Sequence, residues 1–144
     1  MLVEKASIDV VRKSYQGLRK SNEVGRRSPL ADMEKGLIKA TVRGFSRAII
    51  LWLVSQEPMS GYRIVKEMKR LTGQSFHPGI VYPLLYELEK KGFTVSKWKQ
   101  RGRRRINYYS ITEKGTKMLE QLRELFEMPM QQVLKGFLGE TLAE

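Results

Sequence analysis

The sequence of 144 residues contains no cysteine and a single histidine, His77. Disulfides, thiolate metal sites and cysteine nucleophiles are therefore excluded, and one histidine without a cluster of further ligands does not predict a metal site. The sequence also has no Gly-rich phosphate loop and no carboxylates converging on a nucleophile. We therefore expect a protein that is not an enzyme and that needs no cofactor.

Long hydrophobic runs are absent as well. The longest, from Ala48 to Val54, is far shorter than the roughly 20 apolar residues that span a bilayer. Leu2 and Val3 are followed at once by Glu4 and Lys5, which does not resemble a secretory signal. We expect a cytoplasmic protein with no membrane partner, long enough for one modest core.

Acidic residues are in the minority, with 15 Asp and Glu against 27 Lys and Arg, a net charge of +12. Residues 61–110 carry twelve basic and three acidic side chains (12 − 3 = +9), whereas residues 111–144 carry four and six (4 − 6 = −2). A polyanionic partner explains this asymmetry, and double-stranded DNA is the first candidate. An acidic protein or a membrane surface is favoured by nothing beyond the charge.

Hydrophobic periodicity predicts helices over 31–56, 60–72, 78–91 and 112 to about 128. Two β-branched and aromatic runs, 93–98 and 106–111, predict strands on either side of a turn centred on Gly102. The predicted fold is therefore mainly α with a small β-hairpin (α+β). Helix–helix–helix–hairpin–helix is the order of a winged helix-turn-helix, in which the third helix enters the major groove.

The two ends of the chain differ in character. Residues 1–30 form a basic N-terminal extension that is either a helix followed by a hinge or a solvated tail. Residues 31–115 form the predicted DNA-binding domain. Residues 116–144 form a C-terminal dimerisation helix; packing of its apolar face on the N-terminal helix is the alternative. The predicted dimer contacts are Leu119, Leu122, Leu125, Phe126, Val133, Leu134 and Phe137.

The helix predicted over 78–91 has an unusual outward side. Its apolar stripe is assigned to the core, and the opposite side carries small, aromatic and basic residues that suit close approach to another molecule. The arginines of the turn repel one another unless an anion neutralises them. The candidate DNA contacts are Ser75, His77, Gly79, Tyr82, Pro83, Tyr86, Lys90, Arg101, Arg103, Arg104 and Arg105.

Some of these residues also have a purely structural interpretation. Tyr82 could be a half-buried core tyrosine, and His77 could serve structure alone. Glu87 lies at helical spacing from Lys90 and Lys91 and could pair with either. The two tryptophans are interpreted as core or interface anchors rather than as effector contacts: Trp52 and Trp98.

Three motifs in order resemble the PadR family of winged-helix transcriptional regulators. Residues 60–62 (Ser-Gly-Tyr) resemble the start of its second helix, and residues 79–92 resemble its Gly-Thr-Leu-Tyr-Pro recognition helix. Residues 108–115 resemble the end of its wing and the beginning of its dimer helix. Ile80 replaces a usual Thr, Tyr86 a frequently basic residue, and Arg103-Arg104-Arg105 a common Arg-Pro-Arg pattern. The resemblance implies a homodimeric repressor, often relieved by a small aromatic or lipophilic effector.

The sequence as a whole predicts a sequence-specific DNA-binding regulator that acts as a homodimer. Helix 78–91 would lie in the major groove, and the arginine-rich wing 99–105 on the backbone or in the minor groove. The alternative is a non-specific architectural DNA- or RNA-binding protein, which would use the same charge without preferring one sequence.

Overall fold

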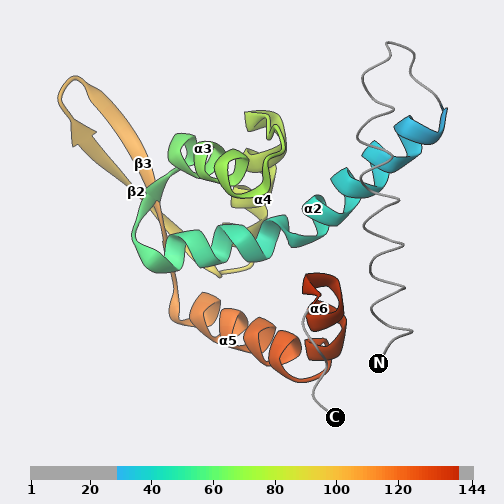
Figure 1. Ribbon diagram of the computed structural model, residues 1–144. Helices are drawn as coiled ribbons and strands as arrows, with labels where there is room; N and C mark the ends of the chain where they lie inside the picture. The colour runs from blue at the N-terminus through green and yellow to red at the C-terminus, as the bar shows by residue number, and fades with distance from the viewer. Residues whose placement is uncertain (1–28, 140–144) are drawn as a thin grey trace, which may run out of the picture. The chain divides into compact units, whose positions relative to one another are not determined.

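The computed structural model describes residues 29–139, and this range contains five helices and three strands (Figure 1). In chain order they are α2 (Pro29–Gln56), β1 (Met59–Ser60), α3 (Gly61–Thr72), α4 (Pro78–Lys90), β2 (Thr94–Arg101), β3 (Arg104–Ile111), α5 (Glu113–Glu127) and α6 (Gln131–Leu138). Residues 1–28 of the predicted extension lie outside the described residues, whereas Pro29 and Leu30 belong to α2, which begins two residues earlier than predicted. The predicted helix–helix–helix–hairpin–helix order is confirmed.

The described residues belong to two compact units. One consists of residues 39–131 and contains α3, α4, α5, the sheet and most of α2. The other contains residues 29–38, at the start of α2, and residues 132–139. In this second unit Met33 and Phe137 are largely exposed, although both are apolar.

The larger unit is built around one hydrophobic core. Ile50 from α2, Ile64 and Met68 from α3, and Val81 and Leu85 from α4 are completely buried. In α3 and α4 these residues are four positions apart, so each of the two helices buries one face. Leu71, the last apolar residue of α3, is exposed and lies outside this core.

Polar caps and glycines set the ends of these helices. The Ser60 hydroxyl accepts a hydrogen bond from the Arg63 N–H at 3.2 Å, and the Thr112 hydroxyl accepts one from the Gly115 N–H at 3.0 Å. Gly73 and Gly92 adopt φ of 67° and 80°, a conformation that favours glycine. The predicted starts and ends of α3 and α4 are thus confirmed to within one residue.

The sheet has one strand more than the sequence predicted. The two residues of β1 pair with β3, giving the antiparallel order β1–β3–β2. The hairpin is also longer than predicted, because Arg101 pairs directly with Arg104 and leaves a two-residue turn. Gly102 takes the first turn position with φ of 61°, as such turns require. Figure 1 shows the β2–β3 hairpin, called the wing below, projecting beyond α3.

Candidate nucleic-acid interface

The side of α4 that faces away from the core carries the residues predicted to contact DNA. Tyr82 is 45% exposed and Tyr86 68% exposed, while Val81, Leu85 and Leu88 on the opposite side are buried. The other predicted contacts of this helix, Gly79, Pro83 and Lys90, are exposed too. The structure therefore brings the predicted α4 residues together on one accessible surface, and Tyr82 is not a core tyrosine.

The Tyr82 ring packs closely against Gly61, the first residue of α3. A Cβ atom added to Gly61 would lie 2.7 Å from the Tyr82 hydroxyl oxygen and 2.8 Å from two ring carbons. Only a glycine leaves room for the ring in this position. The structure explains two residues of the Ser-Gly-Tyr motif at 60–62. Ser60 caps α3, and Gly61 leaves room for Tyr82 of α4.

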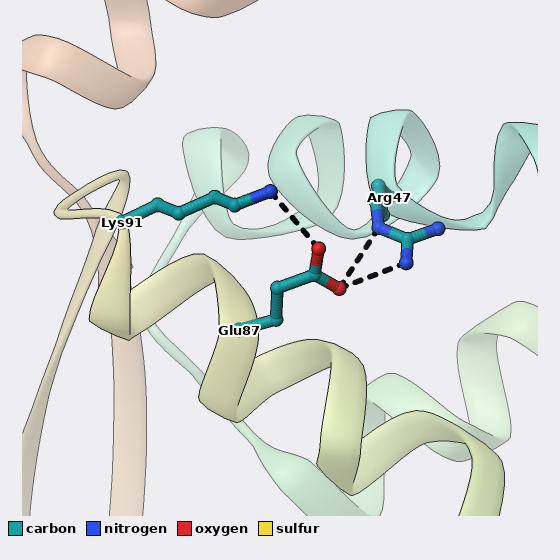
Figure 2. Close-up of polar contacts among 3 residues, drawn as sticks. All are labelled: Arg47, Glu87 and Lys91. Carbon is teal, nitrogen blue, oxygen red and sulfur yellow. Dashed lines mark hydrogen bonds and ion pairs between the residues drawn. The ribbon is translucent and has the colours of Figure 1, made fainter.

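The outward side of α4 is free of carboxylates because both acidic residues of the helix are engaged elsewhere. Glu87 accepts hydrogen bonds from Arg47 of α2 at 2.8 and 3.0 Å and from Lys91 at 3.0 Å (Figure 2). The bond from Arg47, followed by that from Lys91, lowers the pKa of the Glu87 carboxylate. Of the two lysines at helical spacing from Glu87, it is Lys91 that pairs with it. The second partner, Arg47 of α2, was not predicted from the sequence.

The second acidic residue, Glu89, connects α4 to the base of the wing. Its carboxylate accepts hydrogen bonds from the Ser96 hydroxyl at 2.6 Å and from the Ser96 N–H at 3.1 Å. Two hydrogen bonds to one charged acceptor restrain α4 against β2. The position of the wing beside the helix therefore depends on Glu89, which the sequence showed only as one residue of the PadR-like motif 79–92.

The wing arginines do not all face the same way. Side chains alternate along a strand, and directly paired residues share a side. Arg101 and Arg104 are paired and lie on one side of the wing, whereas Arg105 pairs with Gln100 on the other. Arg103 lies in the turn. The same rule places Lys97 and Lys99 with Arg101 and Arg104, and these four residues are called the cationic side of the wing.

Cationic side chains lie over aromatic rings on both sides of the wing. On the cationic side, Lys99 and Arg101 lie 5.6 and 5.7 Å from the centre of the Tyr108 ring. On the other side, Arg105 lies 5.6 Å from the centre of the Trp98 ring. Trp98 is 60% exposed and is therefore not a core residue, whereas its interpretation as an interface anchor stays a prediction. Cations held over aromatic faces keep their charge accessible at the surface.

Ser75 and His77, the two candidates before α4, lie apart from the helix surface described above. Both line a cavity between the α3–α4 turn and α2, together with Lys39 and Arg43. His77 is the N-cap residue of α4, but its side chain makes no capping hydrogen bond. Lys90, at the other end of the helix, is exposed and forms no ion pair with any of residues 29–139.

The motif at the start of α5 is structural. The Thr112 hydroxyl donates to the Gly92 carbonyl at 2.6 Å, and the Lys114 ammonium group donates to the Lys91 carbonyl at 2.7 Å. Gly115 packs so tightly against the Phe93 carbonyl that a Cβ atom there would overlap it. These contacts join the start of α5 to the end of α4 and explain why this segment needs its threonine, lysine and glycine.

This architecture is shared with known regulators. The family model of the PadR-like transcriptional regulators matches residues 50–121, which include α3, α4, both strands of the wing and the start of α5. The chain belongs to the PadR-like family.

Solved structures of PadR-like regulators have the same fold. A PadR family regulator from Eggerthella lenta is 26% identical, with a TM-score of 0.65, and the match covers 78% of this chain and 97% of that one. A PadR-like regulator from Bacillus cereus is also 26% identical, with a TM-score of 0.61, covering 67% and 94%. The predicted winged-helix fold is thereby confirmed.

A curated relative is longer than this PadR-like chain. The Escherichia coli transcriptional regulator YqjI is 28% identical over 103 residues, which are 70% of this chain and 48% of that protein. The chain thus spans about half the length of the curated relatives it matches. Membership of a family of transcriptional regulators agrees with the expectation that the chain is not an enzyme.

Three of the seven predicted dimer residues of this PadR-like chain, Leu119, Leu122 and Phe126, line an apolar groove between α2 and α5. The groove has a volume of about 440 Å³ and includes Ile49 and Trp52 of α2. Phe45 stacks on Phe126 at its wall, with ring centres 5.8 Å apart. Leu119 and Leu122 also line it, whereas Leu125 is 41% exposed. Of the predicted dimer residues in α6, Val133 and Phe137 are exposed and Leu134 is half-buried.

Neither a metal-binding cluster nor a membrane-spanning helix occurs among residues 29–139. No group of three or more His, Asp or Glu side chains among residues 29–139 is placed to hold a metal ion. No helix in that range combines the length and the apolar character needed to cross a membrane.

Proposed function

We propose that this PadR-like chain is a sequence-specific DNA-binding transcriptional regulator that acts as a homodimer and a repressor. In each subunit α4 would lie in the major groove and the wing on the backbone or in the minor groove. The main support is the outward side of α4, where Gly79, Tyr82 and Tyr86 are exposed while Glu87 and Glu89 are engaged away from it. A surface without carboxylates beside a cationic wing suits DNA.

The aromatic residues of α4 are proposed to contribute to specificity. A tyrosine can donate its hydroxyl hydrogen to a phosphate or a base edge while its ring packs against the sugar. The Tyr82 ring packs into the space beside Gly61, whereas Tyr86 is more exposed. The wing cations instead supply attraction that is independent of sequence. Changes at Tyr82 or Tyr86 should therefore alter which sites are preferred, and changes in the wing should not.

Binding specificity tests this function. Genomic fragments retained by the purified chain would be sequenced, and the recovered operator would compete with random duplex DNA at fixed salt. We expect the operator to be preferred by roughly a thousandfold or more, as for typical regulators. A ratio near one would instead identify the alternative, a non-specific architectural DNA- or RNA-binding protein.

The groove between α2 and α5 supports the dimer. Its apolar residues, Trp52 among them, remain partly exposed in the single chain, and a second copy would bury them. A sedimentation mass of twice 16.7 kDa is expected for the purified chain. Leu122→Glu, which puts a charge in the groove, should shift it toward one chain mass. A wild-type chain that sediments as a monomer at micromolar concentration would contradict the homodimer.

The repressor role and the effector rest on the likeness to the family. A reporter gene placed behind the recovered operator should be less active when the chain is present, and higher activity would identify an activator. A small aromatic or lipophilic effector would compete with the second subunit for the apolar lining of the α2–α5 groove. Such a compound should quench Trp52 fluorescence and release the operator together.

A further inference from the structure

Three basic residues of α2 recur every fourth position, Lys39, Arg43 and Arg47, and so lie along one side of the helix. Arg47 is neutralised by Glu87 of α4 at 2.8 Å. Lys39 and Arg43 form no ion pair with any residue in the described range. Arg47, at one end of this basic row, therefore pairs with a carboxylate of α4. Lys39 and Arg43 have no such partner among the described residues.

The unmatched end of the row opens into a cavity. Lys39 and Arg43 line a space of about 450 Å³ that also borders Gln74, Ser75 and His77 at the start of α4. No acidic side chain among residues 29–139 lines it, so the fixed side-chain charges there are positive. The hydroxyl of Ser75 and the amide of Gln74 add hydrogen-bond donors. Its volume falls in the usual range of small-molecule sites, so the cavity can hold more than a single ion.

The start of α4 adds to the positive potential of this cavity. Pro78 occupies the first turn, and the His77 side chain makes no capping hydrogen bond to the helix. Pro78 has no N–H, and the Ile80 N–H donates to the His77 carbonyl at 2.9 Å, so the helix start contributes the positive end of its dipole rather than a free donor lining the cavity. Lys39 and Arg43 supply most of the attraction for an anion in this cavity, and the helix dipole of α4 adds to it.

We propose that this cavity binds a phosphate group. The phosphate oxygens would bridge Lys39 and Arg43 to the polar side chains of the turn that precedes α4, as the Glu87 carboxylate bridges Arg47 to the later part of that helix. Two anionic links at different positions would then fix the recognition helix against α2. The phosphate belongs either to a free phosphorylated compound or to a DNA backbone; the chemistry of the site is the same for both.

The single histidine makes the test specific. His77 lines the cavity, so its imidazole proton resonance reports on this site alone. Inorganic phosphate would be titrated into the full chain at fixed pH, with chloride keeping the ionic strength constant. We expect a saturable shift of the His77 signal, and phosphate binding weakened at least about tenfold in Lys39→Gln/Arg43→Gln, which removes both charge-assisted hydrogen bonds.

The matched control removes two exposed cations that do not line the cavity, Lys35→Gln/Lys117→Gln. It should bind phosphate like the wild type. A shift that does not saturate, or one that is equal in wild type and Lys39→Gln/Arg43→Gln, would overturn the proposal. Both replaced side chains are exposed, so the variant is expected to fold, and its circular dichroism spectrum would verify this.

A second titration distinguishes the two sources of phosphate. If duplex DNA shifts the His77 signal and inorganic phosphate then has no further effect, a backbone phosphate occupies the cavity. If phosphate binds the DNA complex as well as the free chain, the occupant is a free phosphorylated compound. A chain that binds duplex DNA but ignores inorganic phosphate would disprove this site and leave the proposed function intact.

Discussion

The ring of Tyr82 occupies the space that a side chain at Gly61 would fill, with the Tyr82 hydroxyl 2.7 Å from the position of a Gly61 Cβ atom. Glycine at the start of α3 thus determines where a tyrosine of α4 lies. Because Tyr82 is 45% exposed, its ring can move outward if it is displaced. The contact therefore positions a surface side chain rather than filling the core.

Gly61→Ala should weaken DNA binding without lowering the stability of the fold. The added methyl group displaces the Tyr82 ring, while alanine restricts the unfolded chain and favours helix. We expect operator affinity to fall about tenfold, which corresponds to roughly 1.4 kcal/mol. The melting temperature should stay the same or rise. Unchanged affinity in fluorescence anisotropy would show that the position of Tyr82 does not matter for DNA.

Gly79→Ala tests how closely α4 approaches its target. A Cβ atom at Gly79 meets nothing within 4 Å in the free chain, so the substitution should not strain the fold. If α4 lies in the major groove with this side inward, the methyl group should weaken operator binding. Gly36→Ala is the control, because its Cβ also meets nothing within 4 Å but lies on α2. Equal operator affinities in the two variants would argue against this docking.

Gly115→Ala should destabilise the fold itself. Its Cβ would overlap the Phe93 carbonyl, a backbone atom that cannot move away as a side chain can. We expect the free energy of unfolding to fall by about 1–3 kcal/mol, as for other overpacked sites. Urea denaturation measures this, with Gly136→Ala as an unhindered control. A loss no larger than that of the control would show that the segment has room for a side chain.

The Glu87 carboxylate should make stability depend on pH in a defined direction. Its pKa is lowered in the folded chain, chiefly by the hydrogen bond from Arg47 and then by that from Lys91, from an ordinary value of 4.5. The unfolded chain therefore takes up the proton first, and the contribution is present above about pH 4.5 and lost as the pH falls through the folded pKa. Glu87→Gln should lower stability at pH 7 and have less effect at pH 3.

The control for this pH dependence is Glu120→Gln, which removes an exposed carboxylate that has no ion pair among the described residues. Denaturation by urea at both pH values compares the two variants with the wild type. An effect of Glu87→Gln that grows toward low pH would contradict the proposed link between α2 and α4.

The sequence predicted those parts of the fold that have local causes. The predicted bounds of the helices over 60–72 and 78–91 agree with α3 and α4, because helix caps and left-handed glycines act within a few residues. The strand β1 was missed because two residues, Met59 and Ser60, show no alternation. The length of the wing was underestimated because a run of arginines resembles a turn. Only the pairing of strands across Gly102 shows otherwise.

The sequence predicted which residues belong to the candidate site better than it predicted how they are arranged. The outward residues of α4 followed from helical periodicity. The separation of Arg105 from Arg101 required the hairpin register, and the Arg47–Glu87 contact joins residues 40 positions apart. Lys97 and Lys99 were overlooked although their alternation with Arg101 was visible in the sequence. DNA contact by any of these residues stays a prediction.

The salt dependence of operator binding is the most direct test of DNA docking by the wing and α4. Removing one cation that neutralises a phosphate should make the plot of log affinity against log salt concentration shallower by about 0.9. The slope of the variant Arg103→Ala/Arg104→Ala/Arg105→Ala should therefore be shallower by up to roughly 2.7. Lys35→Ala/Lys117→Ala/Lys135→Ala, which removes as many charges outside the wing, should keep the wild-type slope. An arginine variant with an unchanged slope would show that the wing does not bind DNA.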